Sequence, residues 1–311
     1  MTRTTLTAIA LCLSASPAAF GHGQPLPALQ SAQPTPVETT DLGDGFYMLQ
    51  GRGGNIGLLV GEDGAFVIDA DYADLAPALL AEIEEIAGDR PRYLLNTHWH
   101  GDHTGGNAAM QAAGATIISH EGVRDRLSRD VTRDFFGEET TTPAAPEEAW
   151  PVITFSENMT LYLNGQTIRL MHTPSAHTDG DTFVYFEEAD LIHAGDLLFS
   201  GMFPFVDVTS GGTFDGFLDG LALIQDLAGE DTRIIAGHGP LSTEQDVVDC
   251  VEMIEATVAA VSAAMDDGAD LDGLLEAEVL SDWAEDWSWR FINEAAFTRL
   301  IYLDVSGEAR E

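Results

Sequence analysis

Three histidines and an aspartate directly follow one predicted strand, and no other segment limits the fold of this chain so strongly. The strand is Arg92–Leu95, and the segment after it holds His98, His100, Asp102 and His103. A strand that ends in a tight, glycine-containing turn lets these four side chains converge. Imidazole and carboxylate are ligands that Zn²⁺ takes at about 2 Å. The segment therefore predicts a metal site at the end of a buried strand, because a polar loop that merely caps a helix does not need three histidines.

Three later strand patterns each deliver one more potential ligand on a glycine-containing loop. The pairs of strand and ligand are Thr167–Met171 with His177, Leu191–His193 with Asp196, and Arg233–Ala236 with His238. Ligands at the ends of adjacent strands share a cleft in open α/β folds. Together with the first segment they supply seven ligands, which is enough for two metal ions. His172 is the rival of His177, which we favour because it follows the turn instead of ending the strand.

Outside these segments, short strand patterns alternate with amphipathic helix patterns. Helices are expected at 75–87, 106–113, 214–227 and 246–265, and over most of the last forty residues. Residues 132–151 are rich in Glu, Thr, Pro and Gly, so we expect an exposed, mobile loop there. Strands in both halves, with helices between and after them, predict two sheets covered by outer helices, an α/β layered architecture.

The first residues are typical of a secretory signal peptide, which we place at 1–21. An apolar run from Leu6 to about Phe20 follows a positive start, and Ala19-Phe20-Gly21 fits a small-x-small cleavage site. Residues 22–42 are expected to form a flexible leader, and 43–311 a domain with a helical extension at its C-terminus. We therefore expect an exported protein, periplasmic or secreted, without stable insertion in a membrane.

The charge balance is strongly acidic, because Asp and Glu number 52 against 13 basic residues, for a formal net charge of −39. All the basic residues are arginine. Such a surface repels phosphate backbones and anionic lipids, so nucleic acid and membrane surfaces are poor partners. The predicted cleavage removes Cys12 and leaves Cys250 alone, which excludes an internal disulfide. Cys250 falls in a predicted helix far from the histidines in sequence, so it does not compete as a nucleophile.

The pattern His-x-His-x-Asp-His, with the later single ligands, resembles the metallo-β-lactamase superfamily from about Phe46 to Leu241. The resemblance implies an α/β fold of the αββα sandwich type, with two zinc ions at one edge. It implies one zinc on His98, His100 and His177, a second on Asp102, His103 and His238, and Asp196 as the bridge. The third-ligand segment departs from the usual Thr-Pro-Gly-His, since Ser175 and Ala176 precede the histidine. Iron and manganese also accept these ligands, so the metal stays open.

Two such ions bring the pKa of a shared water near 7 and so provide hydroxide at neutral pH. That hydroxide attacks a polarised carbonyl, and Asp102 is expected to act in catalysis by holding the proton of the nucleophile in place. We therefore predict an exported dinuclear zinc hydrolase of small molecules, with β-lactams as the most testable substrates. The alternatives are a lactonase or another ester or thioester hydrolase, and a non-catalytic metal-binding protein.

Several features bear on the substrate. Many β-lactamases hold the carboxylate of the drug with a lysine, and this chain has none. Glutathione thioesters are cytosolic, so the predicted export argues against them. RNA processing conflicts with both the charge and the export.

The sequence also offers candidates for contact with the substrate. They are Arg52, in the glycine-rich loop 51–55, and Trp99 and Phe203, which lie close to ligands in sequence. The tryptophans of the C-terminal region are expected to form a lid or part of the core. The oligomeric state is left open.

Overall fold

The computed structural model describes residues 37–135 and 138–308. The predicted signal peptide and most of the predicted leader lie outside these residues. The expected end of the leader at residue 42 is wrong, since Glu38–Gly43 forms the edge strand β1, which pairs antiparallel with β2 (Phe46–Gln50). The side chains of β1 are mostly exposed, so hydrogen bonding to β2, and not burial, gives this polar segment its strand conformation.

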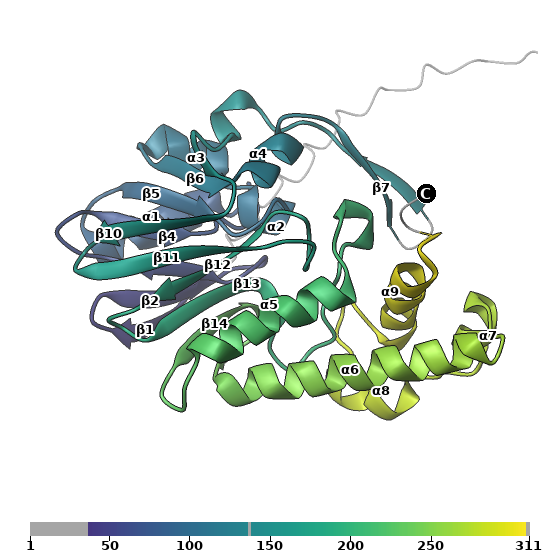
Figure 1. Cartoon of the computed structure of the whole chain (residues 1–311). Coiled ribbons are helices and arrows are strands. Elements are labelled where there is room, and N and C mark those ends of the chain that lie inside the picture. The colour runs from purple at the N-terminus through teal and green to yellow at the C-terminus, as the bar shows by residue number, and fades with distance from the viewer. Residues whose placement is uncertain (1–36, 136–137, 309–311) are drawn as a thin grey trace, which may run out of the picture. The chain divides into compact units, whose positions relative to one another are not determined.

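Two mixed sheets pack against each other, with helices on the outer face of each (Figure 1). The first sheet has the order β1-β2-β3-β4-β5-β6-β9. Its other strands are β3 (Ile56–Leu59), β4 (Ala65–Ile68), β5 (Pro91–Asn96), β6 (Thr116–His120) and β9 (Ile153–Phe155). The second sheet runs β10 (Asn158–Leu163), β11 (Gln166–Thr173), β12 (Asp181–Phe186), β13 (Leu191–Phe199), β14 (Arg233–His238) and β15 (Leu241–Ser242). The predicted α/β sandwich is thus confirmed.

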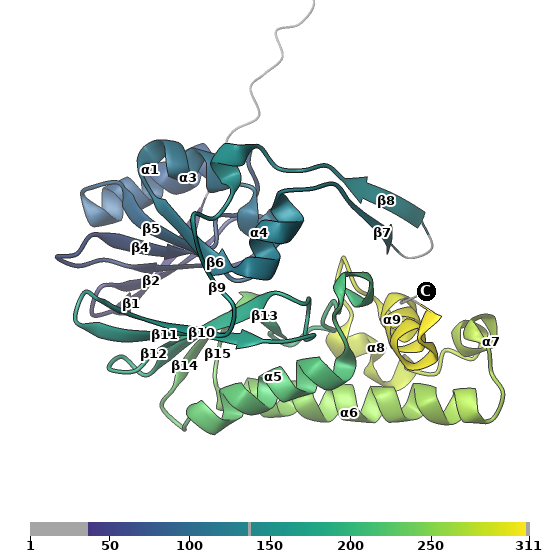
Figure 2. The ribbon, with the colours of Figure 1, turned by 45° about the horizontal axis from the view of Figure 1, so that its top comes forward.

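Helices form the two outer layers, which Figure 2 shows above the first sheet and below the second. The first layer holds α1 (Ala76–Ala87), α3 (Asn107–Ala113) and α4 (Glu121–Leu127), and the short α2 (Gly101–Thr104) lies between β5 and α3. The second layer holds α5 (Phe214–Leu227) and α6 (Glu244–Asp266), followed by α7 (Leu271–Glu276), α8 (Ser281–Trp287) and α9 (Glu294–Ser306). None of the helices described has the length and apolar character that crossing a bilayer requires.

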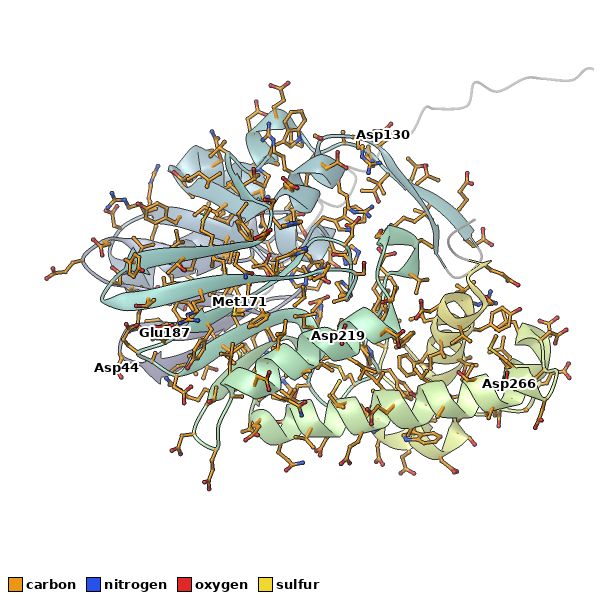
Figure 3. All side chains as sticks on the ribbon, in the orientation of Figure 1. Asp44, Asp130, Met171, Glu187, Asp219 and Asp266 are labelled. Carbon is orange, nitrogen blue, oxygen red and sulfur yellow. The ribbon has the colours of Figure 1, made fainter. Side chains whose placement is uncertain are left out.

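The hydrophobic core lies in three layers. Between the sheets, Phe186 packs edge-on against Phe46 with ring centroids 4.9 Å apart. A second cluster lies between the first sheet and α1 and α3, and a third joins the second sheet to α5, α6 and α9. Every residue of β3 and β4 is buried, because both faces of the first sheet are covered. The carboxylates of Asp44, Asp219 and Asp266 instead lie at the surface, where the excess charge is solvated (Figure 3).

Residues 132–151 are not the open loop expected from their composition. They contain most of a hairpin, β7 (Val131–Phe135) and β8 (Glu138–Thr142), which pairs outside both main sheets. Threonines suit these strands because β-branched side chains favour extended backbone. Val131 holds the base of the hairpin, since it is buried in a small cluster with Trp99, Val123 and Leu127.

Candidate metal centre

All seven predicted ligands come together, in two adjoining groups. The first ligand group is His98, His100, His177 and Asp196, and the second ligand group is Asp102, His103 and His238. The ligand atoms within each group lie within 4.8 Å of one another. Both groups draw on both halves of the fold, because 98–103 follow β5 of the first sheet and the later ligands follow β11 or lie on β13 and β14. The centre therefore forms only where the two sheets meet.

Asp196 joins the two groups. Its Oδ2 lies 3.5 Å from His177 Nε2 and 3.7 Å from His98 Nε2, on the side of the first group. Its Oδ1 lies 3.1 Å from His103 Nε2, and its Oδ2 lies 3.5 Å from His238 Nε2, on the side of the second. This position between the groups is the one expected for a bridging ligand.

Hydrogen bonds set the tautomer of each histidine in the first group. His177 Nδ1 donates to the Phe205 carbonyl at 2.5 Å, and His100 Nε2 donates to Asp207 Oδ2 at 2.9 Å. His98 Nδ1 lies 3.1 Å from Thr97 Oγ1 and donates to it, because the Thr97 hydroxyl already donates to Asp69. The remaining ring nitrogens are bare and face one another, which is the arrangement that metal-ligating histidines require.

Asp69 performs the same task for the second group. Its Oδ2 accepts a hydrogen bond of 2.7 Å from His103 Nδ1, which leaves His103 Nε2 to face Asp102 and Asp196. Asp69 directly follows β4 and has a φ of 67°, in the left-handed region. The sequence held a signal for Asp69, because this residue comes directly after the buried strand β4. The candidate ligands His98 and His238 likewise lie just after or at the end of a strand.

Two glycines leave the room that these ligands need. A Cβ on Gly54 would lie 2.1 Å from the His103 ring, and a Cβ on Gly237 would lie 2.1 Å from Asp196 Oδ1. The backbone N–H of Asn55 donates to the Gly237 carbonyl at 2.7 Å, so the glycine-rich loop meets the end of β14 beside the centre. The glycine-rich loop after β2 is thus explained by close approach to the ligands.

The side chains fit a pair of cations. His100 Nδ1 lies 3.0 Å from His98 Nε2 and 2.9 Å from His177 Nε2, and these three bare lone pairs repel one another unless a cation lies between them. On the side of the second group, His103 Nε2 and Asp196 Oδ1 are buried without a hydrogen-bond partner. Buried polar atoms without partners are costly, and a bound cation satisfies both.

The pKa shifts differ between the two groups. Burial lowers the pKa of His98 well below its usual value, and it lowers those of His100 and His177 as well. Burial also opposes a charge on His238, but Asp196 and Asp102 outweigh it and raise the pKa of His238 to about 9. The pKa of His103 is likewise raised, by Asp196 and Asp69 against the effect of burial. Without a cation, protons therefore balance the carboxylates of the second group.

The second group opens into a cavity of about 580 Å³. Residues from both halves of the chain line it: Arg52, Tyr72, His100, Gly101, Asp102, Arg133, Asp196, Phe199, Phe205, His238, Trp289, Arg290 and Phe291. The side chain of Asp102 is 21% exposed and that of His238 is 15% exposed, whereas His103 is fully buried. A molecule in this cavity therefore reaches Asp102, Asp196 and His238 directly.

The three predicted substrate contacts fare differently. Arg52 lines the cavity, where Asp74 binds its guanidinium at 2.7 and 3.0 Å. Phe203 is fully buried and stacks on Phe297 with ring centroids 4.4 Å apart, so it belongs to the core. Trp99 is 4% exposed and does not line the cavity, because it packs beneath the hairpin with its ring 4.6 Å from the Arg133 guanidinium. For Phe203 and Trp99 the structure favours packing over contact with a substrate.

His172 joins neither ligand group. Its ring stacks on His120 at 3.7 Å, and its Nδ1 donates to the Asp181 carbonyl. Of these two histidines, His177 is therefore the one that lies with the other candidate ligands. Burial raises the pKa of the Cys250 thiol to about 12, which agrees with its exclusion as a nucleophile.

Several residues at the centre were not predicted from the sequence: Asp69, Tyr72, Arg133, Asp207, Trp289, Arg290 and Phe291. Asp207 accepts from both His100 and Arg133, at 2.9 and 2.6 Å. Nothing in the local sequence marks it, because its partners lie 107 and 74 residues away. Of the C-terminal tryptophans, Trp289 lines the cavity, while Trp283 and Trp287 pack against the core.

The chain is similar in sequence to proteins named as hydroxyacylglutathione hydrolases and as thioesterases. A hydroxyacylglutathione hydrolase of Pelagibacter ubique is 29% identical over 149 residues, which cover 47% of this chain and 51% of that protein. An acyl-coenzyme A thioesterase of Gallus gallus is 27% identical over 194 residues, which cover 51% of this chain and 65% of that protein. The chain spans about half the length, or less, of the hydroxyacylglutathione hydrolases that it matches.

A similar solved structure agrees with the fold. It is a metallo-beta-lactamase from Pontibacter korlensis, with a TM-score of 0.59 at 16% identity over 70% of this chain and 99% of that chain. A family model described as the metallo-beta-lactamase superfamily matches residues 49–240, which is more than half of the chain and includes every ligand of both groups. The chain therefore belongs to the metallo-hydrolases of the metallo-beta-lactamase superfamily.

Proposed function

We propose that this protein is a dinuclear metal-dependent hydrolase of acyl thioesters, and that zinc is its metal. The observation that carries the proposal is the pair of ligand groups joined by Asp196 at the floor of an open cavity. A site without a reaction has no need of ligands exposed to a cavity, so a purely structural metal role is disfavoured.

In the proposed reaction, water adds to the thioester carbonyl and the carbon–sulfur bond breaks, which yields a carboxylic acid and a thiol. When bound, two divalent cations lower the pKa of water and polarise the carbonyl oxygen. Asp102 would hold the proton of the attacking water, because its carboxylate faces the cavity. Burial alone would raise the pKa of Asp102, but His103 and His238 hold it below its usual value, so Asp102 is an acceptor at neutral pH. Asp207 and Asp69 keep the ligand rings oriented.

Two observations favour thioesters over the β-lactams expected from the sequence. The two curated relatives described above are named as a hydroxyacylglutathione hydrolase and an acyl-coenzyme A thioesterase. The chain also has no lysine, the residue with which many β-lactamases hold the carboxylate of the drug. We also propose that the protein is exported, on the basis of its N-terminal sequence alone. Its substrates would then be thioesters outside the cytosol.

A substrate panel tests the proposal. Purified protein, loaded with zinc, is assayed for thiol release from S-lactoylglutathione, acetyl-coenzyme A and an S-aryl thioacetate, beside a chromogenic cephalosporin and an aryl lactone. We expect chelator-sensitive thiol release from at least one thioester, at a kcat/KM at least tenfold above that for the cephalosporin. Faster cleavage of the cephalosporin or the lactone than of every thioester would overturn the assignment.

A further inference from the structure

The cavity concentrates positive charge in a strongly acidic protein. Three of the 13 arginines, Arg52, Arg133 and Arg290, line it, although the chain has a formal net charge of −39. Arginines that line a cavity either support neighbouring protein groups or face a ligand. Their partners decide between these roles.

Two of the three guanidinium groups are already engaged. Arg52 forms two hydrogen bonds to the Asp74 carboxylate and lies over the Tyr72 ring at 4.8 Å. Arg133 donates to Asp207 at 2.6 Å and lies over the Trp99 ring at 4.6 Å. Both therefore have a carboxylate partner and an aromatic support within the protein.

Arg290 differs from both. Its side chain is exposed, and it forms no ion pair or hydrogen bond with the side chains that the structure describes, those of residues 37–133 and 138–308. Its backbone is nevertheless held in place on the cavity wall. Trp289 Nε1 donates to the Phe203 carbonyl at 2.9 Å, and Trp289 N donates to the Ile292 carbonyl at 3.0 Å. A fixed turn thus presents to the cavity a guanidinium that pairs with no described carboxylate.

The residues before and after Arg290 are aromatic, and both line the same cavity. The Trp289 ring lies 5.8 Å from the His238 ring and 5.6 Å from the Phe291 ring. Phe291 in turn packs edge-on against Phe205, at 5.5 Å, and is 44% exposed. An apolar wall therefore runs from the second ligand group to Arg290.

We propose that Arg290 binds an anionic group of the substrate, while Trp289 and Phe291 contact the apolar part between that group and the scissile carbonyl. The substrate class is then an acyl thioester that carries a carboxylate or a phosphate, and this inference rests on the proposed function. Guanidinium binds both anions through charge-assisted hydrogen bonds. An anion held at this end of the wall leaves the carbonyl near Asp102 and Asp196.

Two pairs of phenylacetyl thioesters test the proposal. The two members of each pair differ only in whether they carry the anionic group. The first pair is the thioesters of 3-mercaptopropionate and 3-mercaptopropionamide, and the second is those of phosphopantetheine and pantetheine. For Arg290→Gln we expect KM to rise at least tenfold for the anionic member of one or both pairs, with kcat changed less than twofold. The pair that responds tells whether the anion is a carboxylate or a phosphate. The neutral members should keep their KM within twofold.

Arg90→Gln is the matched control, since it removes the same charge from an exposed site outside the cavity, where Arg90 pairs with Glu84. It should leave KM unchanged for all four thioesters. Arg290→Lys retains the charge and should recover most of the loss. Equal KM values for wild type and Arg290→Gln on both anionic members would overturn the inference, as would an equal loss on the neutral ones.

Failure of the proposed function is separable from failure of this inference. If the wild type cleaves none of the four thioesters, the substrate panel described above decides the proposed function, and the uncleaved anionic thioesters become binding probes. Their dissociation constants are then measured by quenching of tryptophan fluorescence in the zinc-loaded protein. At least tenfold weaker binding to Arg290→Gln than to Arg90→Gln supports the anion site, and equal binding refutes it.

Discussion

The two ligand groups share one carboxylate but differ in burial and support. Every member of the first group is buried, and each of its histidines donates its second ring N–H to a fixed acceptor. In the second group, Asp102 and His238 are partly exposed to the cavity, and among the described residues only His103 has such an acceptor, in Asp69. Burial and fixed acceptors suit the first group to holding an ion, whereas partial exposure suits the second group to presenting an ion to a substrate.

The shared residue gives the largest expected effect. Asp196→Ala removes an oxygen from both groups, so we expect loss of both ions and a fall in kcat of about a thousandfold or more. Metal analysis of the purified variant, with kcat on the best thioester, measures this. Asp219→Ala, an exposed change on α5, is the control. Retention of two ions by Asp196→Ala would break the account of Asp196 as the bridge.

Removing a ligand of the second group alone should separate the groups. Asp102→Ala is expected to lose the second ion and about a hundredfold or more in kcat, because the proton acceptor leaves with the ligand. The first ion should stay, with about one metal per chain and a nearly unchanged melting temperature. Metal content and thermal unfolding on one preparation check both statements. If full turnover persists, Asp102 has no catalytic role.

The first group can be weakened in the same way through its support. Asp207→Asn replaces the carboxylate that accepts from His100 and pairs with Arg133. Loss of such a support lowers metal affinity by about 10–100-fold. We expect this loss for the first ion only, as seen by competition with a metal-binding dye. Equal weakening of both ions would show that the groups do not act separately.

A pH titration sharpens the contrast further. In the metal-free protein the pKa of His238 is raised to about 9 and that of His103 is raised too, so below these values protons compete with the second ion. The pKa values of His98, His100 and His177 lie below 6.5, so above pH 6.5 these ligands are already neutral. From pH 9 down to 6.5, affinity for the second ion should fall while affinity for the first stays level. Parallel falls would contradict the assignment.

The sequence was most informative where chemistry is concentrated in adjacent residues. The segment from His98 to His103 predicted the centre, because ligands on one turn need no knowledge of the rest of the fold. His177, Asp196 and His238 followed from a repeated signal, a buried strand that ends beside a glycine-containing loop. The two sheets could also be predicted, because buried strands carry a strong apolar pattern.

Other parts could not be predicted because their cause lies elsewhere in the chain. The hairpin β7–β8 has few apolar residues, and its strands pair with each other outside the main sheets. Asp207 and Arg290 acquire their places through tertiary contacts with residues far away in sequence. Phe203 lies close to Asp196 along the chain, yet its side chain faces the core, so closeness in sequence misled the choice of substrate contacts.

We propose that the two ligand groups together hold two cations, and that thioester hydrolysis requires both of them. The direct measurement is metal content and hydrolysis rate on one preparation, as isolated, after chelation, and after stepwise return of Zn²⁺. We predict that the rate disappears with the metal, stays low at one ion per chain and returns as occupancy approaches about two. A full hydrolysis rate in a preparation whose metal sites are less than about one-tenth occupied would contradict this account.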